Sequence, residues 1–275
     1  MRLAAVVRPS IFRLVSYASI VSAFLMASSS VTTSGGRANA APDCSRPLVV
    51  GVHGVGEGPD EYGSGNPSAP LNDTIKRLRK LQTARKSPEA EALFLRYPTI
   101  SAHTLADLGF WGNGSFFAAV KNASRGLDRE VSRARKACPD RRIALVGYSL
   151  GAWIIDDYLA GQDTAAQQRA ISAVVLYGDP EWPIPSPGGL AREFGHVHIS
   201  PYKPQWLRER FLSMCLPHDV VCNAGHDTAG ARVQQLAACV AGLPGCAHRR
   251  YQLDGVTRRG AQALFGWTGG GGPQK

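Results

Sequence analysis

Residues 143–152 read IALVGYSLGA, and this stretch decides the fold. It begins with an apolar run, Ile143 to Gly147, that lacks polar alternation. Such a run is typical of a strand buried on both faces of a parallel sheet. The residues from Leu150 onward suit a helix, which we predict over Ala152–Leu159. The stretch therefore predicts a strand, a sharp turn at Ser149 and a helix.

Further apolar runs resemble this strand. They lie at Pro47–His53, Ala92–Tyr97, Ser172–Gly178 and Arg210–Met214. Between them, Phe116–Ala137 has helical spacing with its charged residues on one side. Strands that alternate with helices form βαβ units. We therefore predict a single α/β domain with a doubly wound, mainly parallel central sheet flanked by helices.

Ser149 is the candidate nucleophile, because residues 147–151 fit the motif G-x-S-x-G. In this motif a strained turn between strand and helix projects the serine hydroxyl above the sheet. The two glycines remove side chains that would collide with neighbouring backbone. The helix N-terminus supplies an N–H group for an oxyanion. The motif alone occurs by chance in many chains, and its place between a buried strand and a helix favours catalysis here.

Two aspartates compete for the role of catalytic acid. In this architecture the acid follows the serine in the chain and lies on a loop after a later strand. Asp179 directly follows the strand predicted at 172–178, whereas Asp219 lies in the loop between Cys215 and Cys222. A short disulfide loop would hold a carboxylate in place, so we favour Asp219. At Asp179 we expect a structural turn or a helix cap.

The catalytic histidine is harder to choose. His226 and His248 both follow Asp219, and their spacing alone leaves the choice between them open. His218 is too near the acid in the chain to reach around it easily. His53, at the end of the first predicted strand, suits a structural or oxyanion-loop role better than that of a base.

The first 40 residues have the three parts of a secretory signal. Three arginines accompany an apolar stretch from Leu14 to Ala27, and small residues follow at Ala38-Asn39-Ala40. The apolar stretch is shorter than the about 18 residues that span a bilayer. We therefore expect secretion with cleavage after Ala40, a domain over 41–268, and a disordered Gly-rich tail over 269–275.

All six cysteines follow that cleavage site, and three disulfides are expected in an oxidising compartment. The short spacings favour local loops for Cys215 with Cys222 and for Cys239 with Cys246. None of these pairs has the C-x₂₋₄-C spacing of zinc sites, so we expect no metal, and the chemistry calls for no cofactor. The formal net charge is +10, but apart from short runs the basic residues are scattered, which favours a solvated surface over adhesion to anionic envelopes or lipid head groups. We expect no nucleic-acid partner.

Taken together, four motifs resemble the cutinase family of serine esterases, which has the α/β-hydrolase fold. The similar segments are GYSLGA at 147–152, Tyr177-Gly-Asp179-Pro, Cys215-x₃-Asp219-x₂-Cys222 and His248-x-x-Tyr251, which match the family's GYSQGA, FGDP, acid loop and H-x-x-Y. The resemblance covers most of the chain after residue 40.

The resemblance implies a secreted esterase that hydrolyses carboxylic esters with Ser149 as nucleophile, Asp219 as acid and His248 as base. It also implies a disulfide between Cys44 and Cys138. Where the family carries a Ser or Thr in its oxyanion loop, this chain reads His53-Gly-Val55-Gly-Glu57. The oxyanion hole would then use the backbone N–H groups of Val55 and Leu150. We expect a monomer that acts on an ester or lipid substrate, with lipid or polymer surfaces as contacts. The alternatives are a cell-envelope lipid esterase, phospholipase or thioesterase, and a non-catalytic exported lipid-binding relative.

Residues 223–247 separate the acid from the base. The spacing of the apolar residues predicts a short amphipathic helix over 231–240. Its apolar face either packs on the core or covers the acyl site as a lid. In the second interpretation, a Cys239–Cys246 disulfide pins one end of the helix, and Gly225 and Gly230 act as hinges.

Overall fold

The computed structural model describes residues 42–57, 68–98, 114–180, 192–194, 197–199, 204–222, 229–241, 243–253 and 255–268. The predicted signal, the Gly-rich tail, His226 and Gly225 lie outside these residues. Among the described residues, no helix combines the length and the apolar character needed to cross a membrane.

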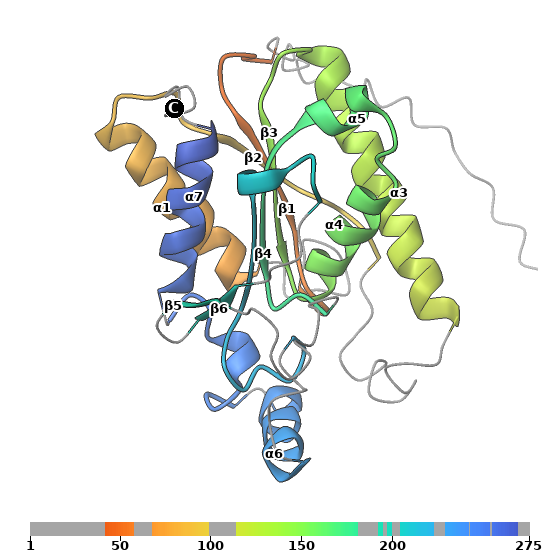
Figure 1. Ribbon diagram of the computed structural model, residues 1–275, viewed down its shortest axis with the longest axis vertical. Coiled ribbons are helices and arrows are strands. Elements are labelled where there is room, and N and C mark those ends of the chain that lie inside the picture. The colour runs from red at the N-terminus through yellow and green to blue at the C-terminus, as the bar shows by residue number, and fades with distance from the viewer. Residues whose placement is uncertain are drawn as a thin grey trace, which may run out of the picture. The chain divides into compact units, whose positions relative to one another are not determined.

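One sheet runs through the domain, in the strand order β2-β1-β3-β4-β7-β6-β5 (Figure 1). Its strands are β1 (Leu48–Val52), β2 (Glu91–Phe94), β3 (Ile143–Tyr148), β4 (Ile171–Tyr177), β5 (Arg192–Phe194), β6 (Val197–Ile199) and β7 (Phe211–Cys215). The neighbours from β2 to β7 pair in parallel, and β7, β6 and β5 pair antiparallel. This confirms the mainly parallel sheet. The short pair β5 and β6, which the sequence analysis did not predict, extends the sheet beyond β7.

Helices cover both faces of the sheet. The helices of the described residues are α1 (Ala69–Ala84), α3 (Gly114–Ala137), α4 (Leu150–Ala160), α5 (Ala165–Ala170), α6 (Ala229–Val240) and α7 (Val256–Thr268), with the 3₁₀ turns η1 (Arg208–Arg210) and η2 (Ala247–Arg249). Figure 1 shows α1 and α7 on one side of the sheet and α3 and α4 on the other. The predicted doubly wound architecture is therefore confirmed.

The core is divided between these two faces. Leu145 of β3 packs in the cluster that includes Leu127 of α3 and Ile154 of α4. The next residue, Val146, packs in the cluster that includes Leu71 of α1 and Leu264 of α7. Because both faces are covered, successive strand residues are all apolar, which explains why β3 has no polar alternation.

Two glycines allow α4 to start directly against the sheet. A β-carbon at Gly151 would lie 2.0 Å from the carbonyl oxygen of Val52, and one at Gly147 would lie 2.8 Å from the α-carbon of Ala152. Both positions therefore exclude any side chain. The glycines of the G-x-S-x-G motif are required by the close approach of β1, β3 and α4.

All six cysteines form disulfides, which pair Cys44 with Cys138, Cys215 with Cys222, and Cys239 with Cys246. The first bridge joins the segment before β1 to the end of α3, across a sequence separation of 94. A loop of that size corresponds to about 4 to 5 kcal/mol in a chain-entropy model. The other two bridges close local loops with a separation of 7 each.

Candidate active site

Ser149 lies at the tight turn between β3 and α4. Its backbone has φ 56° and ψ −125°, in the left-handed half of the map that residues other than glycine rarely occupy. The Ser149 N–H donates to the carbonyl of Tyr177 at 2.9 Å, and the Ser149 carbonyl accepts from the N–H of Ala152 at 2.8 Å. These bonds to β4 and to the first turn of α4 hold the strained conformation that the motif predicted.

Asp219 and His248 form a buried pair. The Nδ1 atom of His248 lies 2.9 Å from Oδ1 and 2.8 Å from Oδ2 of Asp219, whose side chain is fully buried. The Asp219 carboxylate also accepts a hydrogen bond from the N–H of Val221 at 2.9 Å and one from the hydroxyl of Tyr251 at 2.7 Å. A carboxylate held in this way fixes both the tautomer and the orientation of the imidazole.

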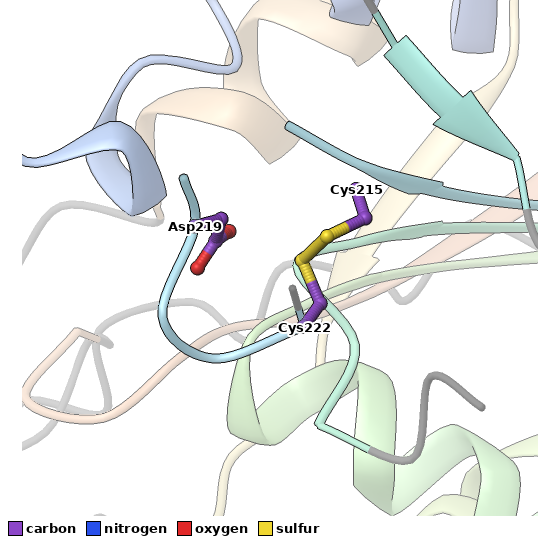
Figure 2. Close-up of side chains that lie close together, drawn as sticks. All are labelled: Cys215, Asp219 and Cys222. Carbon is purple, nitrogen blue, oxygen red and sulfur yellow. A yellow bond between two sulfur atoms is a disulfide. The ribbon is translucent and has the colours of Figure 1, made fainter. Parts of the chain in front are cut away.

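A disulfide shapes the loop that carries the acid. Figure 2 shows the Cys215–Cys222 bridge at the ends of the loop and the carboxylate of Asp219 within it. Cys215, Asp219 and Cys222 have potential metal-ligand atoms within 4.8 Å of one another. Among the described residues, they form the group of His, Cys, Asp or Glu side chains that is close enough to hold a metal ion. Both sulfur atoms are bonded to each other and are not thiolates. The chemistry of this group therefore suits a fixed acid rather than a metal centre.

His248 is enclosed by aromatic rings. The ring of Tyr148, the residue before Ser149, stacks on the imidazole at 4.9 Å, and its hydroxyl donates to the carbonyl of His248 at 2.8 Å. The ring of Tyr251 contacts the imidazole edge-on at 6.3 Å. These contacts tie the histidine to the strand that ends at the candidate nucleophile.

The free nitrogen of the imidazole is available for chemistry. His248 Nε2 is buried and has no hydrogen-bond partner among the described residues. The N–H of Ser149 donates a hydrogen bond to the carbonyl of Tyr177, the last residue of β4. Gly178 follows Tyr177, and a β-carbon at Gly178 would lie 2.6 Å from His248 Cε1. The serine and the histidine thus lie at the same end of β3 and β4, although the described contacts include no hydrogen bond between them. Hydrogen bonds of this kind often form only when a substrate binds.

The loop after β1 lies beside the nucleophile. A β-carbon at Gly54 would be 3.1 Å from the β-carbon of Ser149. Val55 follows directly and is half-buried, and Leu150 is the first residue of α4, where backbone N–H groups lack partners within the helix. The two residues named as backbone donors for an oxyanion are therefore next to the nucleophile in the fold or in the chain.

Glu57 is a residue of this loop to which the sequence analysis gave no role. Its carboxylate accepts a hydrogen bond from the N–H of Gly54 at 3.2 Å. Burial raises the pKa of Glu57 to about 7, against the opposing effects of that hydrogen bond and of the positive charges of His248 and Arg249. A titratable acid therefore stands close to both the oxyanion loop and the candidate base. The sequence signal that could have identified Glu57 is its position two residues after Val55.

The remaining candidates have structural surroundings. His53 is fully buried, stacks on Tyr97 with the ring centres 4.4 Å apart, and has Nδ1 3.1 Å from the carbonyl of Gly54. Asp179 is buried and accepts a hydrogen bond from the hydroxyl of Ser213 at 3.3 Å. His218 is exposed and has φ 64°. Among the candidate acids and bases that lie in the described part of the chain, Asp219 and His248 are in direct contact.

The helix between acid and base is present as α6. It is attached to η2 by the Cys239–Cys246 disulfide and by a hydrogen bond of 3.0 Å from the N–H of Ala247 to Gln235 Oε1. Figure 1 shows α6 beyond the end of the sheet that leads into the acid loop. Val233 of α6 is 69% exposed. The interpretation that the apolar face packs on the core is therefore wrong for Val233.

Comparison with known proteins gives one family. Residues 106–235 match the family model described as Cutinase. Carboxylesterase Culp1 of Mycobacterium tuberculosis is 29% identical over 108 residues, which are 39% of this chain and 46% of that protein. Cutinase CUT1 of Coprinopsis cinerea is 36% identical over 78 residues, which are 28% of this chain and 39% of that protein. The chain thus spans less than half the length of these curated relatives.

Solved structures share the fold over most of the chain. A cutinase-like protein from Cryptococcus sp. has a TM-score of 0.53 at 16% identity, covering 82% of this chain and 97% of that one. The catalytic core of acetyl xylan esterase from Trichoderma reesei has a TM-score of 0.51 at 20% identity, covering 82% and 100%. The sheet, its two helical layers and the strained serine turn define an α/β protein with the α/β-hydrolase type of fold. Within that class, the chain is similar to the cutinase family, whose model matches residues 106–235.

Proposed function

We propose that the protein is a secreted serine esterase that hydrolyses carboxylic esters through an acyl-enzyme. Ser149 is the nucleophile, His248 the general base and Asp219 the acid. The observation that carries this proposal is the buried Asp219–His248 pair, with Nδ1 to Oδ2 at 2.8 Å, at the sheet end where Ser149 is held at φ 56°. Similarity to proteins named carboxylesterase, cutinase and acetylxylan esterase supports the same reaction.

The reaction takes place in two steps. His248 Nε2 accepts the hydroxyl proton while Ser149 Oγ attacks the ester carbonyl carbon, and the resulting tetrahedral species carries a negative oxygen. The bond to the leaving alcohol breaks as His248 returns the proton to it, which leaves the acyl group on Ser149. Water then gives a proton to His248 and attacks the acyl carbon, and the acid is released as the serine regains its proton. Asp219 stabilises the imidazolium in both steps.

The negative oxygen is stabilised by the backbone N–H groups of Val55 and Leu150. Val55 has no hydroxyl to add a further donor, unlike the Ser or Thr of the motif that it replaces. Loss of one oxyanion donor typically lowers turnover by about 10² to 10³. The remaining donors therefore support catalysis at a reduced rate, and the mechanism requires neither a metal nor a cofactor.

Export is the setting that fits the disulfides. All six cysteines are paired, and disulfides persist in oxidising compartments. The arginines near the N-terminus and the apolar stretch before Ala40 supply the signal for export. The mature enzyme would begin after Ala40 and act as a monomer.

An organophosphonate tests the proposed nucleophile directly. The reagent bonds covalently to an activated serine, and peptide mass spectrometry then locates the adduct. We expect a single adduct on Ser149 in the wild type and none in Ser149→Ala. An unmodified Ser149 in folded protein would favour the non-catalytic lipid-binding alternative.

A cell-envelope lipid esterase is the second candidate, and one observation favours it. Large exposed apolar side chains occur, among the described residues, in the segment that includes α6 and the base. They are Val233, Leu243 and Leu253. A series of aryl esters from acetate to palmitate separates the two candidates. If this segment receives long acyl chains, Val233→Ser should lower kcat/KM for the long esters and leave kcat/KM for the acetate unchanged. A wild-type protein that hydrolyses esters of all chain lengths at equal rates would exclude the second candidate.

A further inference from the structure

One phenol group connects the parts of the acid loop. The Tyr251 hydroxyl donates to Asp219 Oδ2 at 2.7 Å and accepts from the N–H of Leu216 at 3.2 Å. It also lies 3.4 Å from the sulfur of Cys222. Leu216 begins the loop, Asp219 lies within it and Cys222 ends it. A single fully buried side chain therefore contacts the loop at its start, at its acid and at its disulfide.

The same residue belongs to the segment that carries the base. Tyr251 follows His248 by three residues, and the two rings are perpendicular with centres 6.3 Å apart. Among the described residues, each Asp219 oxygen has one partner besides the imidazole. Val221 donates to Oδ1 and Tyr251 to Oδ2. Val221 is part of the acid loop itself, so Tyr251 is the partner that fixes the carboxylate relative to the histidine segment.

We propose that Tyr251 is a positioning residue, whose hydroxyl orients the Asp219 carboxylate toward His248 and limits the negative charge available to the imidazole. This inference rests on the proposed triad. Tyr251 does not touch the reacting atoms, and it acts through Asp219.

The hydroxyl is a permanent donor. Burial, followed by the negative charge of Asp219, raises the pKa of Tyr251 well above its usual range. The phenol therefore stays protonated across the pH range in which a histidine titrates. Its proton goes to the carboxylate because the loop N–H of Leu216 occupies its acceptor side. A hydrogen bond to a charged group is among the stronger ones in proteins.

Removal of this donor changes the charge that the imidazole experiences. Without the phenol proton, the imidazole is the partner of Asp219 Oδ2 that remains within the described part of the chain. The imidazolium is then stabilised more strongly, and the acid limb of the rate profile moves to higher pH. Of the residues that the structure describes, the other charged or titratable groups that face the pair are Tyr148 from β3, Glu57 from the loop after β1, and Arg249 beside the histidine. Tyr251→Phe leaves all three in place.

The test compares Tyr251→Phe with Tyr177→Phe. Tyr177 is a fully buried member of the same aromatic cluster, with its ring centre 5.7 Å from that of Tyr251, but its hydroxyl bonds to Thr74 at 2.7 Å. Both variants lose one buried phenol oxygen and keep the ring. In each protein we would measure the pH dependence of kcat and KM on a short aryl ester, the melting temperature, and the NMR resonance of the His248 Nδ1 proton.

For Tyr251→Phe we expect kcat to fall about threefold to tenfold with little change in KM, and the acid limb to move up by about half a pH unit. The Nδ1 proton resonance should shift downfield. Tyr177→Phe should lower the melting temperature and leave both the acid limb and the resonance unchanged. A Tyr251→Phe protein whose profile and resonance equal those of wild type would overturn the inference.

A second substitution covers the case in which Tyr251→Phe does not fold. Incorporation of 3-fluorotyrosine at position 251 keeps the ring and hydroxyl and makes the hydroxyl a stronger donor. The acid limb should then move to lower pH, and an unchanged limb would again overturn the inference. The NMR readout needs no turnover, so the resonance shift tests the role of Tyr251 even if no ester is hydrolysed, in which case the proposed function fails on its own.

Discussion

Gly178 leaves no room for a side chain beside His248. A β-carbon at Gly178 would lie 2.6 Å from His248 Cε1, 2.8 Å from Nδ1 and 3.1 Å from Asp219 Oδ2. Gly178 also has φ 58°, a conformation that favours glycine. Gly178, which follows β4, therefore leaves the space in which Asp219 and His248 contact each other.

Gly178→Ala should disable the enzyme more than it destabilises it. The methyl group would displace the imidazole from the carboxylate, so we expect kcat to fall by about 10² or more, as for other losses of catalytic geometry. Gly255→Ala is the matched control, because Gly255 has φ 73° and its β-carbon would meet the flexible end of Arg258. Both variants should unfold at a slightly lower temperature. Equal activity of the two proteins would show that Gly178 does not protect the pair.

The disulfide of the acid loop should matter more for turnover than for stability. Its sequence separation of 7 corresponds to only about 2 to 3 kcal/mol in the chain-entropy model. Replacing Cys215 and Cys222 by serine frees the backbone around Asp219, so kcat should fall sharply. The Cys239 and Cys246 double serine variant opens a loop of equal separation, which lies at the end of α6. If both double variants lose kcat in the same proportion, the bridge has no special role in holding the acid.

Glu57 should make the stability of the protein depend on pH. Its pKa is raised from 4.5 to about 7 by burial, so between these values the folded state holds a proton that the unfolded state has released. The stabilisation from this group is complete below about pH 4.5 and is lost as the pH rises through about 7. Glu57→Gln has no carboxyl group to titrate at this position, so the variant does not lose this stabilisation as the pH rises. Urea unfolding from pH 4 to 8 should show the variant gaining stability relative to wild type up to about pH 7, whereas a constant difference would contradict the assignment.

The choice of His248 as the base is tested by paired substitutions. His248→Ala removes the imidazole bonded to Asp219 and should eliminate nearly all esterase activity. His226→Ala should keep most of it, and His218→Ala, which changes an exposed side chain, should as well. Initial rates on a short aryl ester, measured with folded proteins of matched circular dichroism, decide the point. Loss of activity in His226→Ala with retention in His248→Ala would reassign the base.

Local sequence patterns were enough to predict the fold. The predicted strands at 47–53, 92–97, 143–147, 172–178 and 210–214 correspond to β1, β2, β3, β4 and β7, with their ends moved by a few residues. A strand covered on both faces is apolar throughout, and this signal is contained in the strand itself. The strands β5 and β6 are three residues each, too short to produce such a run.

The geometry of the candidate site could be predicted where one segment contains the whole constraint. The strained turn at Ser149 follows from a five-residue motif, and the fixed position of Asp219 follows from the cysteines around it. The surroundings of His248 depend instead on contacts between distant segments. Tyr148 is 100 residues away in the chain, and Gly178 lies on another strand. Spacing carries no information on such contacts, which is why the residues alone left the choice of histidine open.

In the proposed mechanism Ser149 performs the chemistry, and the decisive measurement is kcat/KM for aryl butyrate hydrolysis by Ser149→Ala. The hydroxyl lies at a half-buried turn, so its loss should leave the melting temperature close to that of wild type. We expect a residual kcat/KM below about a thousandth of the wild-type value, since the oxyanion hole and binding alone give only weak catalysis. A purified, folded Ser149→Ala protein that keeps more than about a tenth of wild-type activity would show that Ser149 is not the nucleophile.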